Sequence, residues 1–541
     1  MTRIDRVAIF AGIVMTWAGQ PSAGEVRFAN IFGSGGVLQH GKPLPVWGIS
    51  APGETVKVKL CGIGGCTLAR EAATVADRHG KWIVTFDPLT AGDAFHLTVQ
   101  GVDSSSAAYQ MRAGDVWFYA GKYRFRYLRN IPQITEKGWR EQNGDLFPLL
   151  RLYPINGAAG GADACRMPQR LEDGSWKTPE AYNIFNFSPG IMSHFAIELV
   201  REKRIPVGIV YAASIYGHSI DEYLSAETYV HDPVLGKTEA AKALRYSVGG
   251  TAECRQLNAE RIAYMEKYLE KSVKDSDENR TVRDPVFPVA PEGAQPRISY
   301  MYNSAVQPVL PLAVKGVVYN DPGGPNPVDA ASHVAKVELL VRSFRKWFND
   351  PELPVFIIQD PAHRNQNAPE SNAKFAAQQL VSQKDSHVEL VVCHDIEFFS
   401  AVPDLFLKTI PAVGHRLYTL AERKVYGKAS VNSETPTLTG FRCDNGLASL
   451  TFSMPLQTID GMEPDGFAIK AAGQSVYHSA RAEINGHTVT LSAPGVSKPE
   501  QASYGYLNMA IRRTPNVTGT NHMPIAAFST ALLINRHGGT R

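Results

Sequence analysis

Apolar runs that alternate with helical stretches constrain the fold of this chain more than any other feature of its sequence. Short runs rich in Val, Ile and Leu are typical of buried strands, and they occur at residues 149–153, 207–211, 314–319, 355–359 and 388–393. Helical periodicity falls between and beside them, at residues 191–203, 239–274, 334–348 and 372–383. Strands that alternate with helices build a parallel sheet with helices on its faces. The sequence therefore predicts an α/β domain over residues 111–425.

Both flanks of this core are rich in short alternating runs. Residues 55–60, 81–86 and 95–99 alternate apolar and polar side chains, and turn signals such as Pro52-Gly53 lie between such runs. After residue 425 the pattern is again β-rich, and Asn485-Gly486 is a hairpin signal. We predict small β-sandwich modules at residues 25–110 and 426–541.

The N-terminus has the pattern of an export signal. Arg3 and Arg6 precede an apolar run at residues 7–19, and the small residues Ser22, Ala23 and Gly24 follow. A membrane anchor is the other interpretation, but the run is shorter than the ~20 residues that a spanning helix needs. We therefore expect a signal peptide at residues 1–24, a secreted or periplasmic protein, and no membrane association after cleavage.

Composition excludes several classes of function. The chain has 541 residues, of which 44% are hydrophobic and 20% charged, and its net charge of +3 is too weak to predict nucleic-acid binding. The cysteine and histidine spacing matches no zinc site, so we expect neither a metal nor a cofactor. Export makes disulfides possible, and Cys61 and Cys66 could close a hairpin, whereas the other four cysteines give no connectivity.

Several segments resemble, in the same order along the chain, those of a known esterase family. They include the strand Gly114-Asp115-Val116-Trp117 and the stretches at residues 37–48, 77–82, 205–210, 302–310, 315–318, 504–506 and 523–528. This pattern is similar to the sialate O-acetylesterase (SASA-type carbohydrate esterase) family of the SGNH hydrolases. The resemblance implies an SGNH-hydrolase-like, flavodoxin-like core and a carbohydrate ligand.

The blocks that carry the chemistry of that family are altered here. Where the family has its nucleophilic serine, in a Gly-Gln-Ser-Asn-Met turn, this chain has Tyr123. The family's Asp-Ile-His-Pro segment corresponds to residues 404–407, which keep Asp404 but put Phe406 in place of the histidine. The blocks at residues 212–217 and 319–325, which correspond to the oxyanion block and the Gln/Glu block, also differ. The resemblance thus implies three degenerate positions, at Tyr123, Asp404 and Phe406, and no catalytic residue among them.

Ester hydrolysis of this type needs a nucleophile, a base and donors for the oxyanion. The hydroxyl of Tyr123 lies roughly 4 Å further from the backbone than a serine hydroxyl would, and Phe406 has no proton acceptor. We therefore expect a catalytically inactive protein, a pseudoenzyme that acts as a glycan- or partner-binding scaffold. The alternative is an active carbohydrate O-acetylesterase with a rebuilt site. Candidates for such a site are Ser214, Ser219, His218, Asp221 and the pair His394-Asp395.

The residues around the altered positions predict a candidate pocket. They are Lys122, Arg124, Arg126, Tyr216, His218, Asn320 and Asp321. Cations beside aromatic rings could attract an acidic or O-acetylated glycan. The other interpretation is a solvated basic face of a helix, on which Lys122, Arg126 and Arg129 would lie together. A protein partner is the alternative to a carbohydrate.

Overall fold

The computed structural model describes residues 25–64, 67–122, 141–155, 175–179, 190–214, 219–289, 298–321, 330–359, 368–396, 403–506 and 515–531. The predicted signal peptide and Cys66 lie outside these ranges, and Cys61 is an exposed free cysteine at the end of a strand. Within the described residues, no helix combines the length and the apolar character needed to cross a bilayer.

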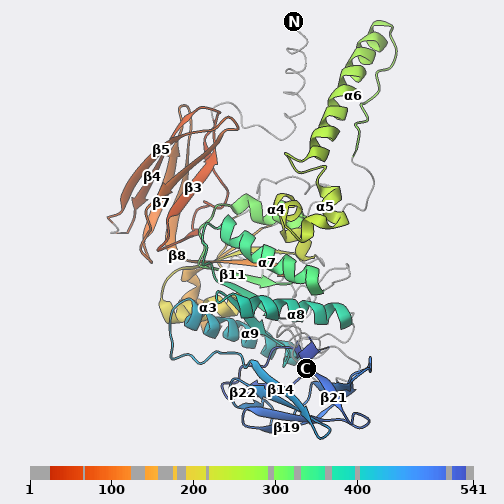
Figure 1. Cartoon of the computed structure of the whole chain (residues 1–541). Helices are drawn as coiled ribbons and strands as arrows, with labels where there is room; N and C mark the ends of the chain where they lie inside the picture. The colour runs from red at the N-terminus through yellow and green to blue at the C-terminus, as the bar shows by residue number, and fades with distance from the viewer. Residues whose placement is uncertain are drawn as a thin grey trace.

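The core is a parallel sheet, as the alternation of runs predicts (Figure 1). Its strands are β8 (Ser105–Lys122), β9 (Leu150–Pro154), β10 (Val207–Ser214), β11 (Gly316–Asn320), β12 (Val355–Gln359) and β13 (Val388–Val392). They lie in the order β9-β10-β8-β11-β12-β13. Without the edge strand β9, this is the 2-1-3-4-5 order of a flavodoxin-like sheet. The α/β fold class is therefore confirmed.

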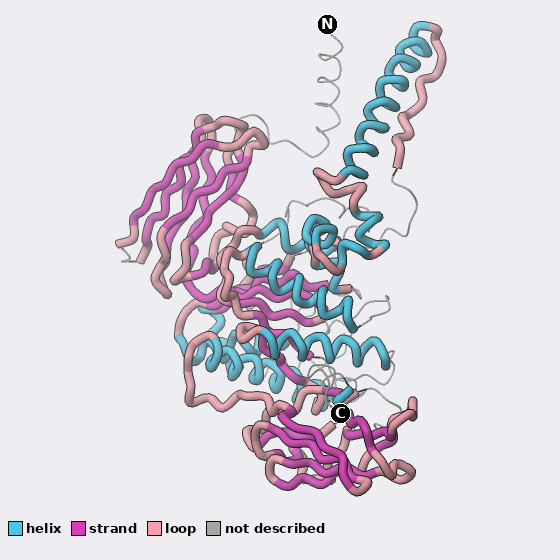
Figure 2. The backbone as a smooth tube through the Cα atoms, in the orientation of Figure 1, coloured by secondary structure: helices cyan, strands magenta, loops and turns pink. Residues whose placement is uncertain are grey.

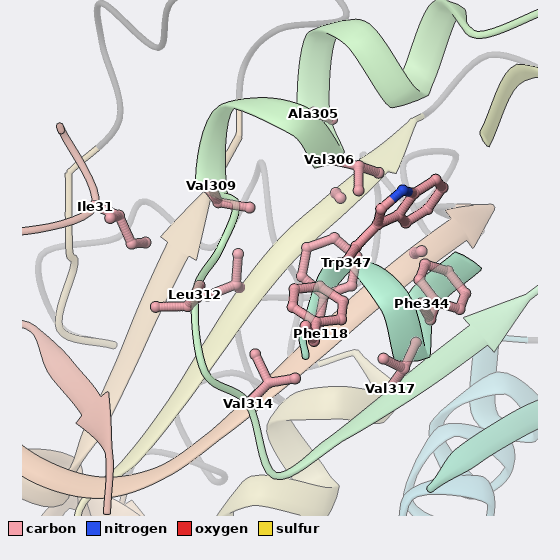
Figure 3. Packing of buried hydrophobic residues seen from close by; sticks show 14 of the residues in the cluster. Ile31, Phe118, Ala305, Val306, Val309, Leu312, Val314, Val317, Phe344 and Trp347 are labelled. Carbon is pink, nitrogen blue, oxygen red and sulfur yellow. The ribbon is translucent and has the colours of Figure 1, made fainter. Parts of the chain in front are cut away.

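Helices cover both faces of this sheet. On one face α3 (Ile191–Lys203) packs against α9 (Pro403–Lys424), and on the other α7 (Ala330–Trp347) packs against α8 (Ala368–Lys384). Successive side chains of β8 point to opposite faces. Trp117 contacts Phe195 of α3, with 4.9 Å between the ring centroids. Phe118 points to the other face, where its ring centroid lies 6.2 Å from that of Phe344 of α7, and Figure 3 shows these two rings. Because both faces are covered, residues 113–120 of β8 are all buried.

The N-terminal strands share a sheet with the core. β8 pairs antiparallel with β7 (Ala94–Gln100) along its first half, and β4 (Thr55–Gly62) and β5 (Ala69–Val75) continue beyond β7. A second sheet holds β1 (Arg27–Phe28), β3 (Leu44–Ile49) and β6 (Lys81–Phe86), while β2 (Val37–Gln39) pairs with β8. The domain boundary proposed at residues 110 and 111 thus falls inside β8.

The C-terminal region is built of strands. One sheet has the order β14 (Leu438–Asp444), β15 (Leu447–Phe452), β20 (Thr488–Ser492), β19 (Arg481–Asn485), and a second has β18 (His478–Ser479), β17 (Phe467–Ala471), β21 (Pro499–Tyr504), β23 (Phe528–Ser529). β16 (Leu456–Thr458) pairs with β22 (Val517–Gly519). The hairpin predicted at Asn485-Gly486 joins β19 to β20. A shared apolar cluster holds these strands together, and sandwich modules on the two flanks stay a prediction.

Between β10 and β11 the chain forms α4 (Ala226–His231), α5 (Glu239–Leu244) and α6 (Ala252–Asp277). A single helix predicted at residues 239–274 is therefore wrong. The break falls at Gly249-Gly250, where Gly250 has a φ of +87°, and the hydroxyl of Thr251 caps the start of α6. α6 points away from the rest of the molecule (Figures 1 and 2).

Candidate active-site edge

The carboxyl ends of β8 and β11 mark the place where a ligand would be expected. In the sheet, the strands that follow β8 in the sequence, β9 and β10, lie on one side of β8 and β11, whereas β12 and β13, which follow β11, lie on the other side. Ligands of doubly wound sheets bind at such a switch point. Gly121, near the end of β8, has a φ of +110° and lies against β11. A Cβ at this position would come within 1.9 Å of the carbonyl oxygen of Asn320. Only glycine therefore lets the two strand ends approach this closely.

Two buried tyrosines form hydrogen bonds with the residues of this contact, Asn320 and Gly121. The hydroxyl of Tyr119 is 3.4 Å from Nδ2 of Asn320, which donates to it. The hydroxyl of Tyr223 lies 3.0 Å from the carbonyl oxygens of both Gly121 and Ala212, and it can donate to one of them at a time. Burial raises the pKa of Tyr223 well above its usual value. Its hydroxyl therefore keeps its proton and links the ends of β8 and β10.

The carboxylate of Asp321 is the centre of a buried polar cluster. Nε2 of His333, on α7, lies 3.0 Å from its Oδ2, and Nζ of Lys374, on α8, lies 3.3 Å from its Oδ1. Nε2 of Gln378 donates to Oδ2 at 3.4 Å. Asp321 and His333 are each only 3% exposed. Lys374 and Gln378 are four residues apart, so α8 presents both on one side.

Sequence reasoning named Asn320 and Asp321 but missed their partners. His333, Lys374 and Gln378 belong to no motif, and they come from two helices that follow later in the chain. The one signal that could have found them is the spacing of Lys374 and Gln378 on a helix that covers the sheet. Because buried polar groups are rarely left unpaired, the amino group of Lys374 and the amide of Gln378 are expected to bond a buried polar group of the sheet.

Asp221 and Ser219, candidates for a rebuilt site, lie beside this edge with other partners. Oδ2 of Asp221 accepts from Nζ of Lys336 at 2.9 Å, and its backbone oxygen accepts from the N–H of Ser299. Ser219 precedes the 3-10 turn Ile220–Tyr223, and its N–H donates to Glu222 at 3.3 Å. Both residues therefore hold a turn in place.

His394 and Asp395 follow β13 and face different neighbours. Nε2 of His394 lies 2.8 Å from Oε1 of Gln359. The same Oε1 accepts from the N–H of Ala527, and the amide nitrogen of Gln359 donates to the carbonyl oxygen of Phe375. Oε1 is thus an acceptor, so His394 carries its proton on Nε2. Burial lowers the pKa of His394 to about 3, and the imidazole is neutral. The carboxylate of Asp395 instead pairs with Arg416, 2.7 Å from Nη1.

Several buried acceptors at this edge lack a partner among the residues that the structure describes, including Oε1 of Gln378 and Oδ1 of Asp221. The two most deeply buried are Oδ1 of Asn320 and Nδ1 of His394. Each belongs to a side chain no more than 1% exposed. Since buried acceptors are normally satisfied by a protein group, a water or a ligand, both mark places for a donor.

A second pair of aspartate and histidine lies at the opposite edge of the sheet. Oδ1 of the buried Asp115 is 3.1 Å from Nε2 of His40, and the hydroxyl of Tyr426 donates to Oδ2 at 2.7 Å. Burial raises the pKa of Asp115, but the hydrogen bond of His40, the charge of Lys315 and the hydrogen bond of Tyr426 together lower it. This pair lies where β8 enters the parallel sheet, far from the switch point. It joins β2, β8 and the segment after α9.

Most of the predicted pocket falls on residues that the structure does not describe. Tyr123, Arg124, Arg126, Tyr216 and His218 lie outside the described ranges. Lys122 is the last residue of β8 and pairs with Ser214, so the prediction that it begins a basic helix face is wrong. Asp404 and Phe406 belong to the first turns of α9, and their side chains are not described. In the described part of the chain, no three His, Cys, Asp or Glu side chains are grouped as metal ligands.

Comparisons with known proteins agree with the fold. The chain is 21% identical to sialate O-acetylesterase of Mus musculus over 459 residues, which cover 80% of both chains. A carbohydrate acetylesterase from Xanthomonas citri superposes with a TM-score of 0.68 and 22% identity, covering 93% of this chain and 99% of the other. No protein-family model matches the chain. The solved structure shows a shared fold, and the curated relative extends the likeness to the sequence.

Proposed function

From the premise that this chain is sialate O-acetylesterase-like, we propose that it binds a carbohydrate without hydrolysing an ester at the family's serine position. The ligand class is an acidic or O-acetylated glycan, in keeping with relatives whose names refer to sialate and carbohydrate acetyl esters. Because the sequence predicts a signal peptide, we also propose that the protein is secreted or periplasmic.

The observation that carries this proposal is that the hydrogen-bond donors around Asp321 are already paired with its carboxylate. An acyl-transfer site must aim free donors at the oxygen on which negative charge develops. At this switch point His333, Lys374 and Gln378 face a carboxylate that belongs to the protein itself. The buried negative charge of Asp321 would repel an oxyanion that develops nearby. It also occupies the hydrogen-bond donors that could otherwise stabilise such an oxyanion.

The altered motif positions support the same conclusion. Tyr123 and Phe406 stand where the family has its nucleophile and its base. Losing one member of a triad lowers the rate on the order of 10⁴-fold or more, and here two are replaced. The candidate replacements Asp221 and His394 are engaged by Lys336 and Gln359.

Carbohydrate binding is supported by the acceptors that lack donors. Oδ1 of Asn320 and Nδ1 of His394 have no partner among the described residues. Sugar hydroxyl groups are donors of suitable size, and they can satisfy acceptors of this kind. A glycan is therefore a better match for this edge than an apolar ligand.

The test measures hydrolysis and binding on the same sample. We expect the purified protein to hydrolyse p-nitrophenyl acetate and O-acetylated sialic acid no faster than a heat-inactivated control. On a glycan array it should retain acidic or O-acetylated glycans, and Asn320→Ala should reduce that signal. Turnover well above the control would overturn the proposal, and so would the absence of binding to every glycan.

A second candidate function is an active O-acetylesterase with a rebuilt site. It is favoured by the Asp321–His333 pair, since a carboxylate that orients a histidine is the arrangement of a catalytic base. Labelling with a fluorophosphonate distinguishes the two functions. A single labelled serine whose modification disappears in His333→Gln would favour the active enzyme, whereas an unlabelled protein favours the binding function.

A further inference from the structure

The helix α6 and the segment that returns beside it form a projection, which we call the α6 arm (residues 252–289). α6 has 26 residues, about 39 Å at 1.5 Å per residue, and among them only Leu257 is buried. The arm extends away from the sheets and from the other helices (Figure 2). A helix in water takes most of its stability from an apolar face packed against something else.

One face of α6 is packed by the return segment. The hydroxyl of Tyr264 accepts from the N–H of Val286 at 2.8 Å, and the hydroxyl of Tyr268 donates to the carbonyl of Arg283 at 2.7 Å. The rings of Tyr264 and Phe287 lie 6.0 Å apart. The return segment therefore covers the side of α6 that carries the two tyrosines.

The opposite side of α6 carries a heptad pattern. Residues spaced alternately by four and three share it, namely Arg255, Ala259, Ile262, Glu266, Leu269 and Val273. At 100° per residue, all six point within about 40° of the direction opposite Tyr264. Ile262 is 55% exposed and Val273 is 61% exposed. This spacing is the one that lets two helices pack side by side.

The charged residues on the heptad side of α6 favour one orientation for a pair of α6 helices from two copies of the chain. A parallel pair of α6 helices would set Glu266 against Glu266 and Arg255 against Arg255. In an antiparallel pair, Ile262 faces Glu266 and Ala259 faces Leu269 of the other copy. Arg255 then lies within a turn of Glu270 and Asp277 of that copy, which carry the opposite charge.

We propose that the α6 arm joins two copies of this chain through an antiparallel pair of α6 helices. The heptad side supplies the contact, and Arg255 with Glu270 and Asp277 fixes the orientation. Because the arm extends beyond the body of the molecule, two copies can meet there without contact between their sheets (Figure 1).

The molecular mass of the protein in solution tests the proposed α6–α6 interface. Light scattering over a concentration series should give a dimer for the unaltered chain and a monomer for Ile262→Glu, since the charge would be buried at the centre of the contact. Val286→Glu is the matched control. Val286 is 78% exposed on the return segment, and its substitution should leave the dimer intact. A monomeric unaltered chain, or a dimer broken by Val286→Glu but not by Ile262→Glu, would overturn the proposal.

Introduced cysteines test the orientation in a background where Cys61, Cys66, Cys165, Cys254 and Cys443 are replaced by serine and only the buried Cys393 remains. In the antiparallel pair, residue 263 of one copy is level with residue 265 of the other, so the two copies of residue 263 are offset by only about 3 Å along the helix axes. Ala263→Cys should therefore form a disulfide-linked dimer. Residues 276 of the two copies would lie about 36 Å apart at 1.5 Å per residue, so Ser276→Cys should stay unlinked. Linking of Ser276→Cys but not of Ala263→Cys would indicate a parallel pair and contradict the proposed orientation.

Discussion

Asp321 lies at the end of β11 with its two carboxylate oxygens facing donors from α7 and α8. Nζ of Lys374, a side chain that is 14% exposed, lies 3.3 Å from Oδ1 of this carboxylate. Both residues lie at the carboxyl edge of the sheet, beside the switch point between β8 and β11. At the scale of single residues, this cluster is a structural joint between the sheet and two helices, and its removal should be measurable as a loss of stability.

Asp321→Asn tests that role. The substitution leaves Lys374 with no opposite charge in the cluster and replaces one acceptor by a donor, so we expect the free energy of unfolding to fall by about 2–4 kcal/mol. Denaturant unfolding followed by circular dichroism measures the change. Asp284→Asn, at an exposed position of the return segment, is the control and should change stability by less than about 0.5 kcal/mol. Equal effects of the two substitutions would contradict the structural role of Asp321.

His394 predicts a dependence of stability on pH. Its pKa is lowered by burial to about 3 in the folded chain, against about 6.5 in an unfolded chain. Between these values the unfolded state binds the extra proton, so stability falls as the pH is lowered from about 6.5 towards 3, and His394 has no such effect at higher pH. His394→Gln should reduce the slope of unfolding free energy against pH by about 1.4 kcal/mol per unit between pH 4 and 6.

The control for this measurement is the same pair of proteins above pH 7.5. There the two slopes should coincide, because His394 is neutral in both the folded and the unfolded state. A variant that only loses packing would shift the whole curve without changing its slope below pH 6. An unchanged slope would therefore show that His394 is not held neutral by burial.

At the scale of elements, the core strands β9 to β13 and the helix α3 could be predicted from periodicity alone. Buried parallel strands are nearly continuous apolar runs, so these five were visible in the sequence, whereas the central strand β8 was expected only from the family resemblance at residues 114–117. α9 was missed, because its first residues were interpreted as a degenerate catalytic motif around Phe406. The partners of Asp321 could not be predicted either, since they depend on how α7 and α8 lie over the sheet.

The end of β8 offers a test at this scale. Gly121→Ala would place a Cβ within 1.9 Å of the carbonyl oxygen of Asn320, at a residue with a φ of +110°. We expect a loss of about 2–5 kcal/mol from backbone strain and overpacking together. Gly53→Ala, at a φ of +78° with no atom within 4 Å, should cost only the backbone strain, about 1–2 kcal/mol. Similar losses in thermal or denaturant unfolding would contradict the close contact of β8 and β11.

At the scale of the whole molecule, β8 makes the N-terminal strands and the core one sheet. The boundary predicted at residues 110 and 111 rests on a change from alternating β runs to a pattern of strands and helices, and such a pattern does not reveal that one strand crosses it. The pairing of β8 with β7 on one half and with β10 and β11 on the other appears only in three dimensions.

A chain that begins at residue 111 tests this unity. It would lose β2 and with it Gln39 and His40, which bond the buried carboxylate of Asp115. We expect this shortened chain to aggregate or to lack a cooperative unfolding transition, because Asp115 would keep a buried charge with fewer donors and β8 would lose part of its pairing. A soluble monomer whose unfolding transition matches that of the full chain would show that the core is independent.

The shared strand has a consequence for the order in which the molecule assembles. β7 and β8 are joined by a short turn, whereas the parallel partners of β8 are far away in sequence, Asp115 facing Val207 and Trp117 facing Gly316. Local pairing closes a small loop and costs little entropy, while distant parallel pairing is slow. We therefore expect the N-terminal strands to form early and to hold β8 extended, as a template on which β10 and then β11 dock. Folding would proceed from the part of the chain that is synthesised first towards the edge where we propose that a glycan binds.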